Sequence, residues 1–432
     1  MHDLEKIQKS LLKAGMDDVV LKKYNAEESM LKFVDNKIVK TGVESGTLIN
    51  IFVAKDKKLV TTTIKEFDDI SINNTLKKLV SFIKNSQPNK NYIGIPENKF
   101  TYPKIEGLFD KKIKDLDEVD QVEAAINASS ENAKRTSGTF QTSLGKVSIS
   151  TSTGIQREEM LSGLYLSLRA LVNKEASGHQ TGSSRITSKF NAEKIGRKAG
   201  EIAKLAVNPK EGKAGRYNVV FSPLAFAPIL DNIGEASSIF SVESGMSFFQ
   251  DKLNKQLGNF NLTDDGTLTN GFGSIPFDDE GHPTQKTEVI KDGILKTYLH
   301  NTSSAQRHKT KSTGNAGIIS PNPTNIILDG KIGNPFDVKD GIYITNVWYT
   351  RFQNYVIGDF STIPRDGMFL IKNGQITEPI KNLRVSENVL NLLKNIELFG
   401  KEKEQITSWE AGTPSIMAPI LIKNVNLTKP TS

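Results

Sequence analysis

The stretch SPLAFAPILDNIGEASS, residues 222–238, follows a β-like run at residues 217–221. It lies where the sequence changes from mixed helix and strand patterns to mainly strand patterns. It predicts a helix that opens after Pro223, because its apolar side chains recur at helical spacing. These apolar positions are Phe226, Ile229, Leu230 and Ile233. Asp231 and Glu235 are four residues apart, so a helix places both carboxylates on one face.

Strands dominate the sequence after this helix. Asp292-Gly293 and Asn373-Gly374 separate alternating apolar runs, and such pairs are the strongest short signals for a β-hairpin. One late helix is expected within residues 386–398, with Ser386 as its N-cap. Residues 215–432 are therefore predicted to form a β-rich C-terminal domain with few helices.

The sequence before residue 215 reads as mixed α/β. An amphipathic helix is expected at the N-terminus, with Leu4, Ile7 and Leu11 facing inward. Alternating strands follow, joined by turns at Asp35-Asn36 and Asp56-Lys57. Helices and strands alternate again further on, with another turn predicted at Thr153-Gly154.

A polar, proline-containing link at residues 86–104 divides this first half. The predicted domains are thus an N-terminal α/β subdomain at 1–85, a middle α/β subdomain at 105–208 and the C-terminal domain at 215–432. The fold class expected for the whole chain is α+β.

The composition is that of an ordinary globular protein, with 37% hydrophobic and 24% charged residues. The net charge of +7 comes from the first 210 residues, which hold 34 Lys and Arg against 26 Asp and Glu. These charges are interleaved and form no basic block, so a nucleic-acid partner is not expected. No apolar run is long enough to span a membrane.

The chain contains no cysteine, which excludes disulfides, thiol catalysis and cysteine-ligated metals. The first residues lack a basic start followed by an apolar stretch, so no secretory leader is expected. We therefore expect a cytoplasmic protein that binds no membrane.

Phosphate-binding loops, nucleophile elbows and H-E-x-x-H are all missing from the sequence. His300 and His308 are eight residues apart, about two helical turns, and are expected to be surface residues too far apart to share a metal. His282 lies in the acidic turn FDDEGHP at residues 277–283, which we expect to be a solvated hairpin end.

The chain as a whole resembles the TldD/PmbA family, and within it the PmbA (TldE) branch. The matching stretches occur in the family's order along nearly the full length. They are VDNKIVKTGVESGTLINIFV (34–53), STSTGIQRE (150–158), FDDEGHPTQKTEVIKDGILKTYLHNTSSAQR (277–307), KSTGNAG (311–317), NYVIGDFS (354–361) and the segment from Asp366 to Gly400.

This resemblance implies a dimeric assembly that acts on unfolded or modified peptides. TldD-type members carry zinc on an H-E-x-x-x-H helix with a later cysteine ligand, and PmbA-type members are their partners and lack that motif. The motif falls here on residues 230–235: Leu230 and Glu235 take the histidine positions and Asp231 takes the glutamate position. The resemblance thus implies a degenerate site, with zinc in a TldD-like partner and no cofactor in this chain.

Three functions stay open from the sequence. The chain is a non-catalytic PmbA/TldE-like subunit, a stand-alone metallopeptidase with a non-standard metal site, or a peptide-binding homodimer. The second requires His300 or His308 to approach Asp231 and Glu235. Donors to a bound peptide are expected in the segments around residues 300 and 311, and the candidates are Asn301, Ser312, Thr313 and Asn315.

Overall fold

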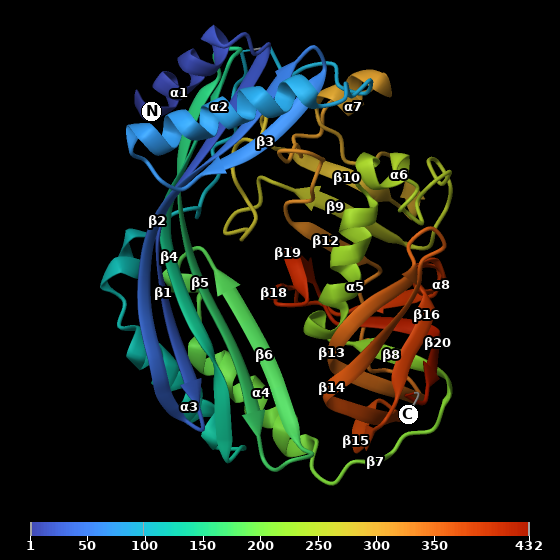
Figure 1. The fold of residues 1–432 in the computed structure, drawn as a ribbon. Helices are drawn as coiled ribbons and strands as arrows, with labels where there is room; N and C mark the ends of the chain where they lie inside the picture. The colour runs from blue at the N-terminus through green and yellow to red at the C-terminus, as the bar shows by residue number, and fades with distance from the viewer. Residues whose placement is uncertain (1, 98, 431–432) are drawn as a thin grey trace.

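The computed structural model describes residues 2–97 and 99–430. A long antiparallel sheet of six strands forms the first half, in the order β3-β2-β1-β4-β5-β6. Figure 1 shows it as a tall curved wall beside the C-terminal half. Its strands are β1 Asp18–Val34, β2 Lys37–Lys55, β3 Lys58–Ile64, β4 Arg135–Thr151, β5 Gln156–Leu171 and β6 Ser177–Ser184.

Helices cover the two ends of this sheet separately. The upper pair, α1 (His2–Lys13) and α2 (Asp69–Asn85), packs on β1, β2 and β3. The lower pair, α3 (Glu118–Ser130) and α4 (Ala192–Leu205), packs on β1, β4, β5 and β6 together with the short 3₁₀ helix η1 (Lys111–Asp115). A second 3₁₀ helix, η2 (Thr187–Lys189), precedes α4.

Strand β1 runs through both ends of the sheet and pairs with β4 from Val20–Thr151 to Val34–Ser137. The segments 1–85 and 105–208, predicted to be two subdomains, therefore share one sheet. The pairing of β1 with β4 joins segments more than 100 residues apart, so no local pattern indicates it.

The C-terminal half contains two further sheets. The first has the order β11-β10-β9-β12-β19-β18. In the second, β13 pairs with both β8 and β14, so that β13, β8, β20, β16 and β14 close into a small barrel. The strands are β7 Lys210–Glu211, β8 Gly215–Phe221, β9 Phe260–Asp265, β10 Lys286–Lys291, β11 Ile294–Leu295, β12 Ile326–Gly330, β13 Asp340–Asn354, β14 Asp359–Lys372, β15 Gln375–Lys381, β16 Arg384–Asn388, β17 Ile396–Phe399, β18 Glu404–Ser408, β19 Ala411–Met417 and β20 Ile420–Thr428.

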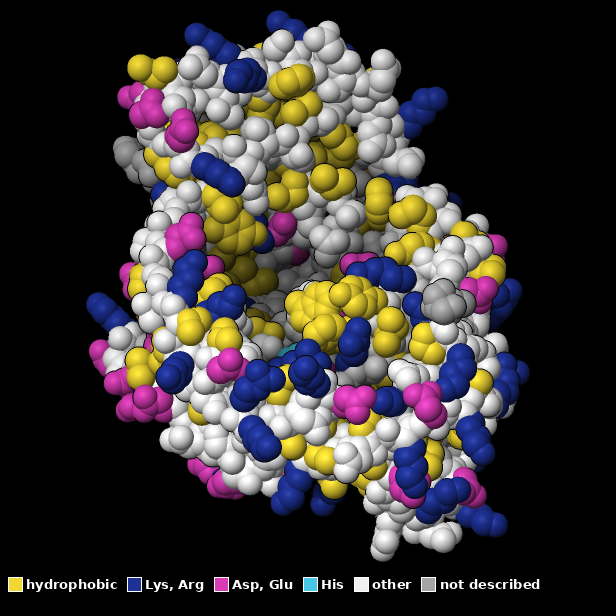
Figure 2. All heavy atoms as spheres, turned by 60° about the horizontal axis from the view of Figure 1, so that its bottom comes forward, with side chains coloured by type: hydrophobic (Ala, Val, Ile, Leu, Met, Phe, Trp, Pro, Cys, Tyr) yellow, Lys and Arg dark blue, Asp and Glu magenta, His cyan; other side chains and the backbone are white. Residues whose placement is uncertain are grey.

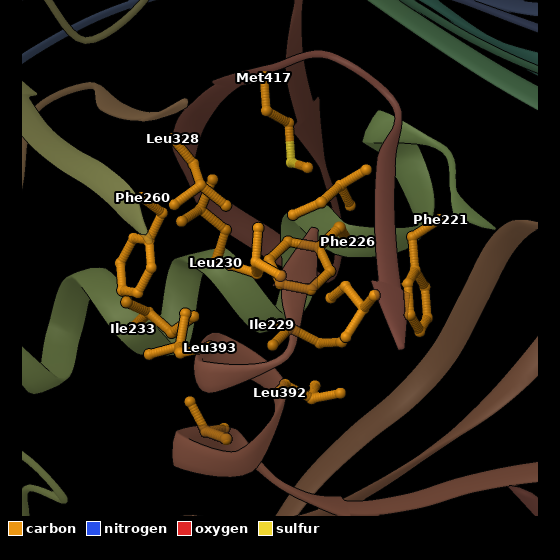
Figure 3. Packing of buried hydrophobic residues seen from close by; sticks show 14 of the residues in the cluster. Phe221, Phe226, Ile229, Leu230, Ile233, Phe260, Leu328, Leu392, Leu393 and Met417 are labelled. Carbon is orange, nitrogen blue, oxygen red and sulfur yellow. The ribbon is translucent and has the colours of Figure 1, made fainter. Parts of the chain in front are cut away.

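Helix α5 (Pro223–Ala236) lies between these two sheets and forms the centre of the main core. Its side chains Phe226, Ile229, Leu230 and Ile233 are fully buried, and Figure 3 shows them packed against residues of β9, β12, β19 and α8. The remaining helices are short: α6 Ile239–Glu243, α7 Thr302–Arg307 and α8 Val389–Lys394.

The α+β prediction is confirmed, as is the amphipathic first helix, whose Leu4, Ile7 and Leu11 are buried. The predicted turns also form, with positive φ at Asp35-Asn36 and at Asp292-Gly293. No helix among the described residues is long and apolar enough to cross a membrane.

The late helix differs from the prediction in its start. Ser386 lies in β16, paired with Ser361 of β14, so it takes part in a strand ladder and caps no helix. The N-cap is Asn388, whose side chain accepts hydrogen bonds from the backbone N–H groups of Leu390 and Asn391.

Candidate functional site

Helix α5 begins as the sequence predicts. Ser222 is its N-cap: its hydroxyl oxygen accepts a hydrogen bond from the Ala225 N–H and the hydroxyl donates to the Thr345 carbonyl at 2.6 Å. Pro223 occupies the first turn, where a missing N–H costs nothing. The helix is thus anchored at its start to β13, and its later turns are held in a fixed orientation.

The three residues at the positions of the degenerate motif, Leu230, Asp231 and Glu235, lie in three different environments. Leu230 is fully buried in the core, near Phe260 and Leu328 (Figure 3). Asp231 accepts hydrogen bonds from the backbone N–H groups of Gly412 (3.2 Å) and Thr413 (2.9 Å) at the start of β19. These contacts make the Asp231 carboxylate an anchor for that turn.

Glu235 is exposed one turn further along α5. Loss of solvent around its carboxylate, and then the negative charge of Asp231, raise its pKa above the usual value for glutamate. A bound cation stabilises the charged forms of two carboxylates that repel each other in this way. Zinc, however, takes at least three protein ligands, mainly nitrogen or sulfur.

The residues at these positions therefore do not fit zinc. Leu230 offers no ligand atom, and the Asp231 carboxylate is already engaged with two amides. In the part of the chain that the structure describes, no three His, Asp or Glu side chains are grouped in a way that could hold a metal ion.

A groove runs beside the turn that Asp231 holds. Its larger part has a volume of about 860 Å³ and lies between the lower half of the long sheet and the β18–β19 hairpin. A second part of about 420 Å³ continues toward residues 314–316 and 322–324. Both parts share Phe272, Thr407 and Gly412, and Figure 2 shows this face of the molecule hollowed at its centre with apolar side chains around the hollow.

Arg185 fixes one wall of this groove. Its guanidinium donates to the carbonyl oxygens of Ser162 (2.9 Å) and Phe272, and it lies 5.1 Å from the centre of the Phe272 ring. Because burial disfavours its charge, the pKa of Arg185 falls to about 10. The carbonyls of the 271–272 loop are thus held against β5, and Phe272 is presented to the groove.

Trp409 also lines the groove and was not singled out in the sequence. It lies in the turn of the β18–β19 hairpin, is 58% exposed, and packs edge-on against Trp348 at 5.7 Å and Tyr349 at 6.1 Å. Tyr349 has a φ of 59°, a costly conformation for an aromatic residue. In the sequence, this part of the groove is indicated only by a tryptophan within a short polar turn, and that pattern matches no known motif.

Of the four residues predicted to contact a peptide, Asn315 lines the smaller part of the groove. Its side-chain NH₂ donates to Asp264 Oδ2 at 2.6 Å and to the Asn322 carbonyl at 3.0 Å. Asp264 is buried, and this burial raises its pKa to about 6. Asn315 therefore also fixes the position of a buried acid.

The other three residues lie elsewhere. Asn301 is the N-cap of α7 and lines a separate cavity of about 370 Å³. Thr313 is buried, and its hydroxyl binds the backbone N–H and carbonyl of His300. Ser312 contacts the same carbonyl at 3.4 Å. Ser312 and Thr313 thus brace the segment that precedes α7.

The prediction of two distant surface histidines holds only for the exposure of His308. His300 is buried, and its ring centre lies 5.5 Å from that of His308. The helix between them has only six residues, so the flanking residues fold back toward each other. Burial lowers the pKa of His300 to about 4.

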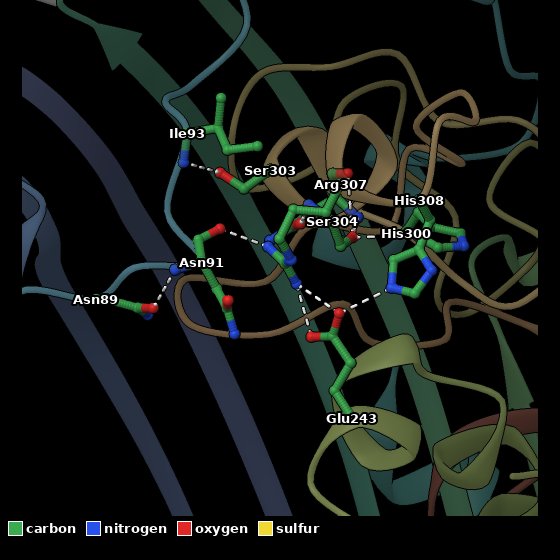
Figure 4. A network of polar contacts seen from close by, with 10 residues as sticks. Asn89, Asn91, Ile93, Glu243, His300, Ser303, Ser304, Arg307 and His308 are labelled. Carbon is green, nitrogen blue, oxygen red and sulfur yellow. Dashed lines mark hydrogen bonds and ion pairs between the residues drawn. The ribbon is translucent and has the colours of Figure 1, made fainter.

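Among the described residues, neither His300 nor His308 forms a hydrogen bond or ion pair with Asp231 or Glu235; their rings contact Ser304 and Glu243 instead. Figure 4 shows Glu243 of α6 bound to His308 at 2.8 Å and to the Arg307 guanidinium at 2.6 Å. This network ties α7 to α6 and gives no support to a metal site completed by His300 or His308.

The acidic turn at residues 277–283 is also not solvated as predicted. Asp278 and Glu280 are buried, and Asp279 forms an ion pair with Lys22 of β1. Glu280 accepts a hydrogen bond from the Thr302 N–H at 3.0 Å, and burial raises its pKa to about 7. The turn joins the long sheet to the C-terminal half and so fixes the upper end of the groove.

Comparison with known proteins identifies the family. The description "PmbA/TldA metallopeptidase central domain" matches residues 108–207, and "PmbA/TldA metallopeptidase C-terminal domain" matches residues 214–429. The protein MJ0231 of Methanocaldococcus jannaschii is 30% identical over 411 residues, covering 91% of this chain and 93% of its own length. Metalloprotease MJ0996 of the same organism is 28% identical and covers 94% of both chains.

Among solved structures, TldE from Thermococcus kodakarensis shares the fold with a TM-score of 0.87 at 19% identity, covering 99% of this chain and all of that one. The family models and the full-length relatives together decide the assignment. This chain belongs to the PmbA/TldD metallopeptidase family.

Proposed function

We propose that this chain is the PmbA/TldE-like, non-catalytic subunit of a cytoplasmic metallopeptidase assembly that acts on unfolded or modified peptides. In this proposal a TldD-like partner supplies the zinc, and this chain contributes part of the cavity that holds the peptide. The likeness to TldE and the groove beside β19 support it.

The observation that carries the proposal is the engagement of Asp231. In a zinc peptidase of the H-E-x-x-x-H type this position supplies the general base, which must reach a metal-bound water. Here the carboxylate is 2.9 Å from the Thr413 N–H and 3.2 Å from the Gly412 N–H. It holds the start of β19, and the groove beside it is lined by aromatic, hydroxyl-bearing and charged side chains.

The lining of the groove suits an extended peptide. Trp409 and Phe272 offer apolar surface, while Thr139, Gln141 and Ser143 of β4 offer hydrogen-bonding groups. Such a mixture binds main-chain groups and apolar side chains together, with little demand on a particular sequence.

The test uses the two tryptophans of the chain. Replacing Trp348 by phenylalanine leaves Trp409 as the only tryptophan, and an unstructured peptide added to this variant should shift its emission. In the presence of a TldD-like chain, Trp409→Ala should raise the KM for an unstructured fluorogenic peptide.

The matched control is Phe82→Ala on α2, since Phe82 is 66% exposed and lies outside the groove. Peptidase activity of this chain alone, inhibited by a chelator, would contradict the subunit proposal. A change in KM that is equal for Trp409→Ala and Phe82→Ala would contradict the proposed peptide groove.

A further inference from the structure

The upper end of the long sheet and helices α6 and α7 enclose the cavity of about 370 Å³ that Asn301 lines. The link at residues 89–95 forms part of its wall, and Figure 4 shows this link held against α7. The Ser303 hydroxyl accepts a hydrogen bond from the Ile93 N–H at 3.1 Å. The cavity thus has walls fixed from both halves of the chain, and its volume lies in the range of small-molecule sites, about 300–1,000 Å³.

Apolar side chains form much of the cavity wall. Phe52 of β2 and Tyr92 line it together, with their ring centres 5.8 Å apart. Phe240 of α6 and Ile319 also line it and are 45% and 73% exposed, so part of this apolar surface is accessible from solvent. A wall of this kind accepts the apolar part of a ligand and leaves its orientation to a few polar groups.

The charges around the cavity leave one acid uncompensated. Among the described residues, the charged side chains that line it are Glu243, Asp279, Glu280 and Arg307. Glu243 binds the Arg307 guanidinium at 2.6 Å, and Asp279 forms its ion pair with Lys22. Within the same part of the chain, Glu280 forms no ion pair. A cation is therefore the ligand charge that this cavity favours.

The Glu280 carboxyl also has unused capacity to accept hydrogen bonds. It is 8% exposed, and among the described residues only Thr302 hydrogen-bonds it, through an N–H at 3.0 Å. An ionised carboxylate has about four acceptor positions. Asp278 in the same turn accepts three backbone N–H bonds instead. Asp278 therefore holds the turn in place, whereas Glu280 is left able to bind a donor in the cavity.

A primary ammonium group suits the free side of the Glu280 carboxylate. It is a compact cation with three N–H donors, whereas a guanidinium prefers both oxygens of a carboxylate at once, and Thr302 occupies one of them. In the described chain no three His, Asp or Glu side chains are grouped to hold a metal ion. A free amino acid would bring its own carboxylate close to Glu243 and Asp279, which repel it.

We propose that this cavity binds a primary ammonium group carried on an apolar chain, with the ammonium on Glu280 and the chain against Phe52 and Phe240. Two sources offer this chemistry, a free aliphatic amine and the N-terminus of a peptide. The second would join this cavity to the proposed peptide groove, because Asp279 and Gly317 line both. The inference itself does not rest on the proposed function.

The first test is calorimetric titration of the full chain with 3-methylbutylamine at pH 8, where the amine is charged because aliphatic amines have a pKa of about 10.4. The amine should bind at one saturable site, and 3-methylbutan-1-ol, which has the same chain without the charge, should bind at least about tenfold more weakly. Glu280→Gln keeps an acceptor for the Thr302 N–H and should weaken amine binding by a similar factor. The matched control is Glu123→Gln, an exposed acid on α3 at the other end of the sheet, which should bind as the wild type does.

The pH dependence of binding is a second readout that a merely structural role of Glu280 would not give. Burial, and then the charges of Asp279 and Asp18, raise the pKa of Glu280 to about 7. Because its ionised fraction rises about tenfold from pH 6 to pH 8, affinity for the amine should rise about tenfold over that range. Asp278 and Tyr92 also lie near this carboxyl, and Glu280→Gln, which should remove the rise, separates their contribution from that of Glu280.

The chain-binding wall is tested by Phe240→Ala, which should weaken amine binding roughly fivefold and leave its pH dependence unchanged. Phe82→Ala, again an exposed phenylalanine elsewhere, should have no effect.

The two sources are separated with the peptide Leu-Ala-Ala amide and its N-acetylated form. Binding of the free peptide but not of the acetylated one assigns the site to peptide N-termini, and binding of the small amine alone assigns it to free amines. Three results would overturn the inference: no saturable binding of either amine, equal binding of the amine and the alcohol, or equal effects of Glu280→Gln and Glu123→Gln. Each of these leaves the subunit proposal standing, whereas zinc-dependent peptidase activity of this chain alone would refute only that proposal.

Discussion

The substitution Asp231→Ala separates a structural anchor from a catalytic or metal-binding group. The carboxylate accepts two backbone hydrogen bonds, from Gly412 and Thr413. In the variant, water can bind the freed N–H groups and so replace part of the lost hydrogen bonding, because Gly412 is exposed and Thr413 is half-buried. We expect the free energy of unfolding to fall by about 1–2 kcal/mol, toward the low end for bonds to a charged group.

For a folding unit the size of the C-terminal half, that loss lowers Tm by roughly 2–8 °C. Differential scanning calorimetry measures it, with and without a chelator. Asp231→Asn keeps one acceptor oxygen and should lose about half as much. Glu235→Ala is the matched control: its side chain is exposed and repels Asp231, so Tm should stay the same or rise slightly.

The reasoning is refuted if Asp231→Ala has the wild-type Tm in chelator-treated protein. It is also refuted if the chelator lowers the wild-type Tm but not that of Asp231→Ala, since Asp231 would then hold a metal.

Three further outcomes follow from buried polar groups and the core. Leu230→His should lower the free energy of unfolding by about 3–5 kcal/mol in urea, because it puts a polar ring into the core; a small loss with bound zinc would contradict this. The pKa of Asp264, about 6, lies above its unfolded value, so stability should fall by about 2 kcal/mol as pH rises from 4 to 6, and Asp264→Asn should flatten that slope in urea titrations. Lys22→Met leaves the partly buried Asp279 carboxylate without its ion-pair partner and should cost about 2–4 kcal/mol. Lys22→Met with Asp279→Leu should recover most of it, and no loss in the single variant would show that the pair is dispensable.

Local patterns in the sequence predict local structure well in this chain. The Asp-Gly and Asn-Gly pairs form turns because few other residues accept a positive φ. Helix α5 follows from its apolar spacing and from Ser222 and Pro223 at its start. Each of these features depends on fewer than twenty neighbouring residues.

The site depends on contacts that are distant in sequence. Asp231 meets Thr413 across 182 residues, and Arg185 holds the Phe272 carbonyl across 87. No periodicity indicates such pairs. The histidine prediction fails for the related reason that a helix of six residues ends before the assumed second turn, which brings His300 and His308 together.

The most direct test of the subunit proposal is the zinc content of the chain purified alone, measured by elemental analysis beside a chelator-treated control. The proposal predicts no retained zinc and no peptidase activity, with activity appearing only when a TldD-like chain is added. Near-stoichiometric zinc that leaves with the chelator, together with peptidase activity, would contradict it.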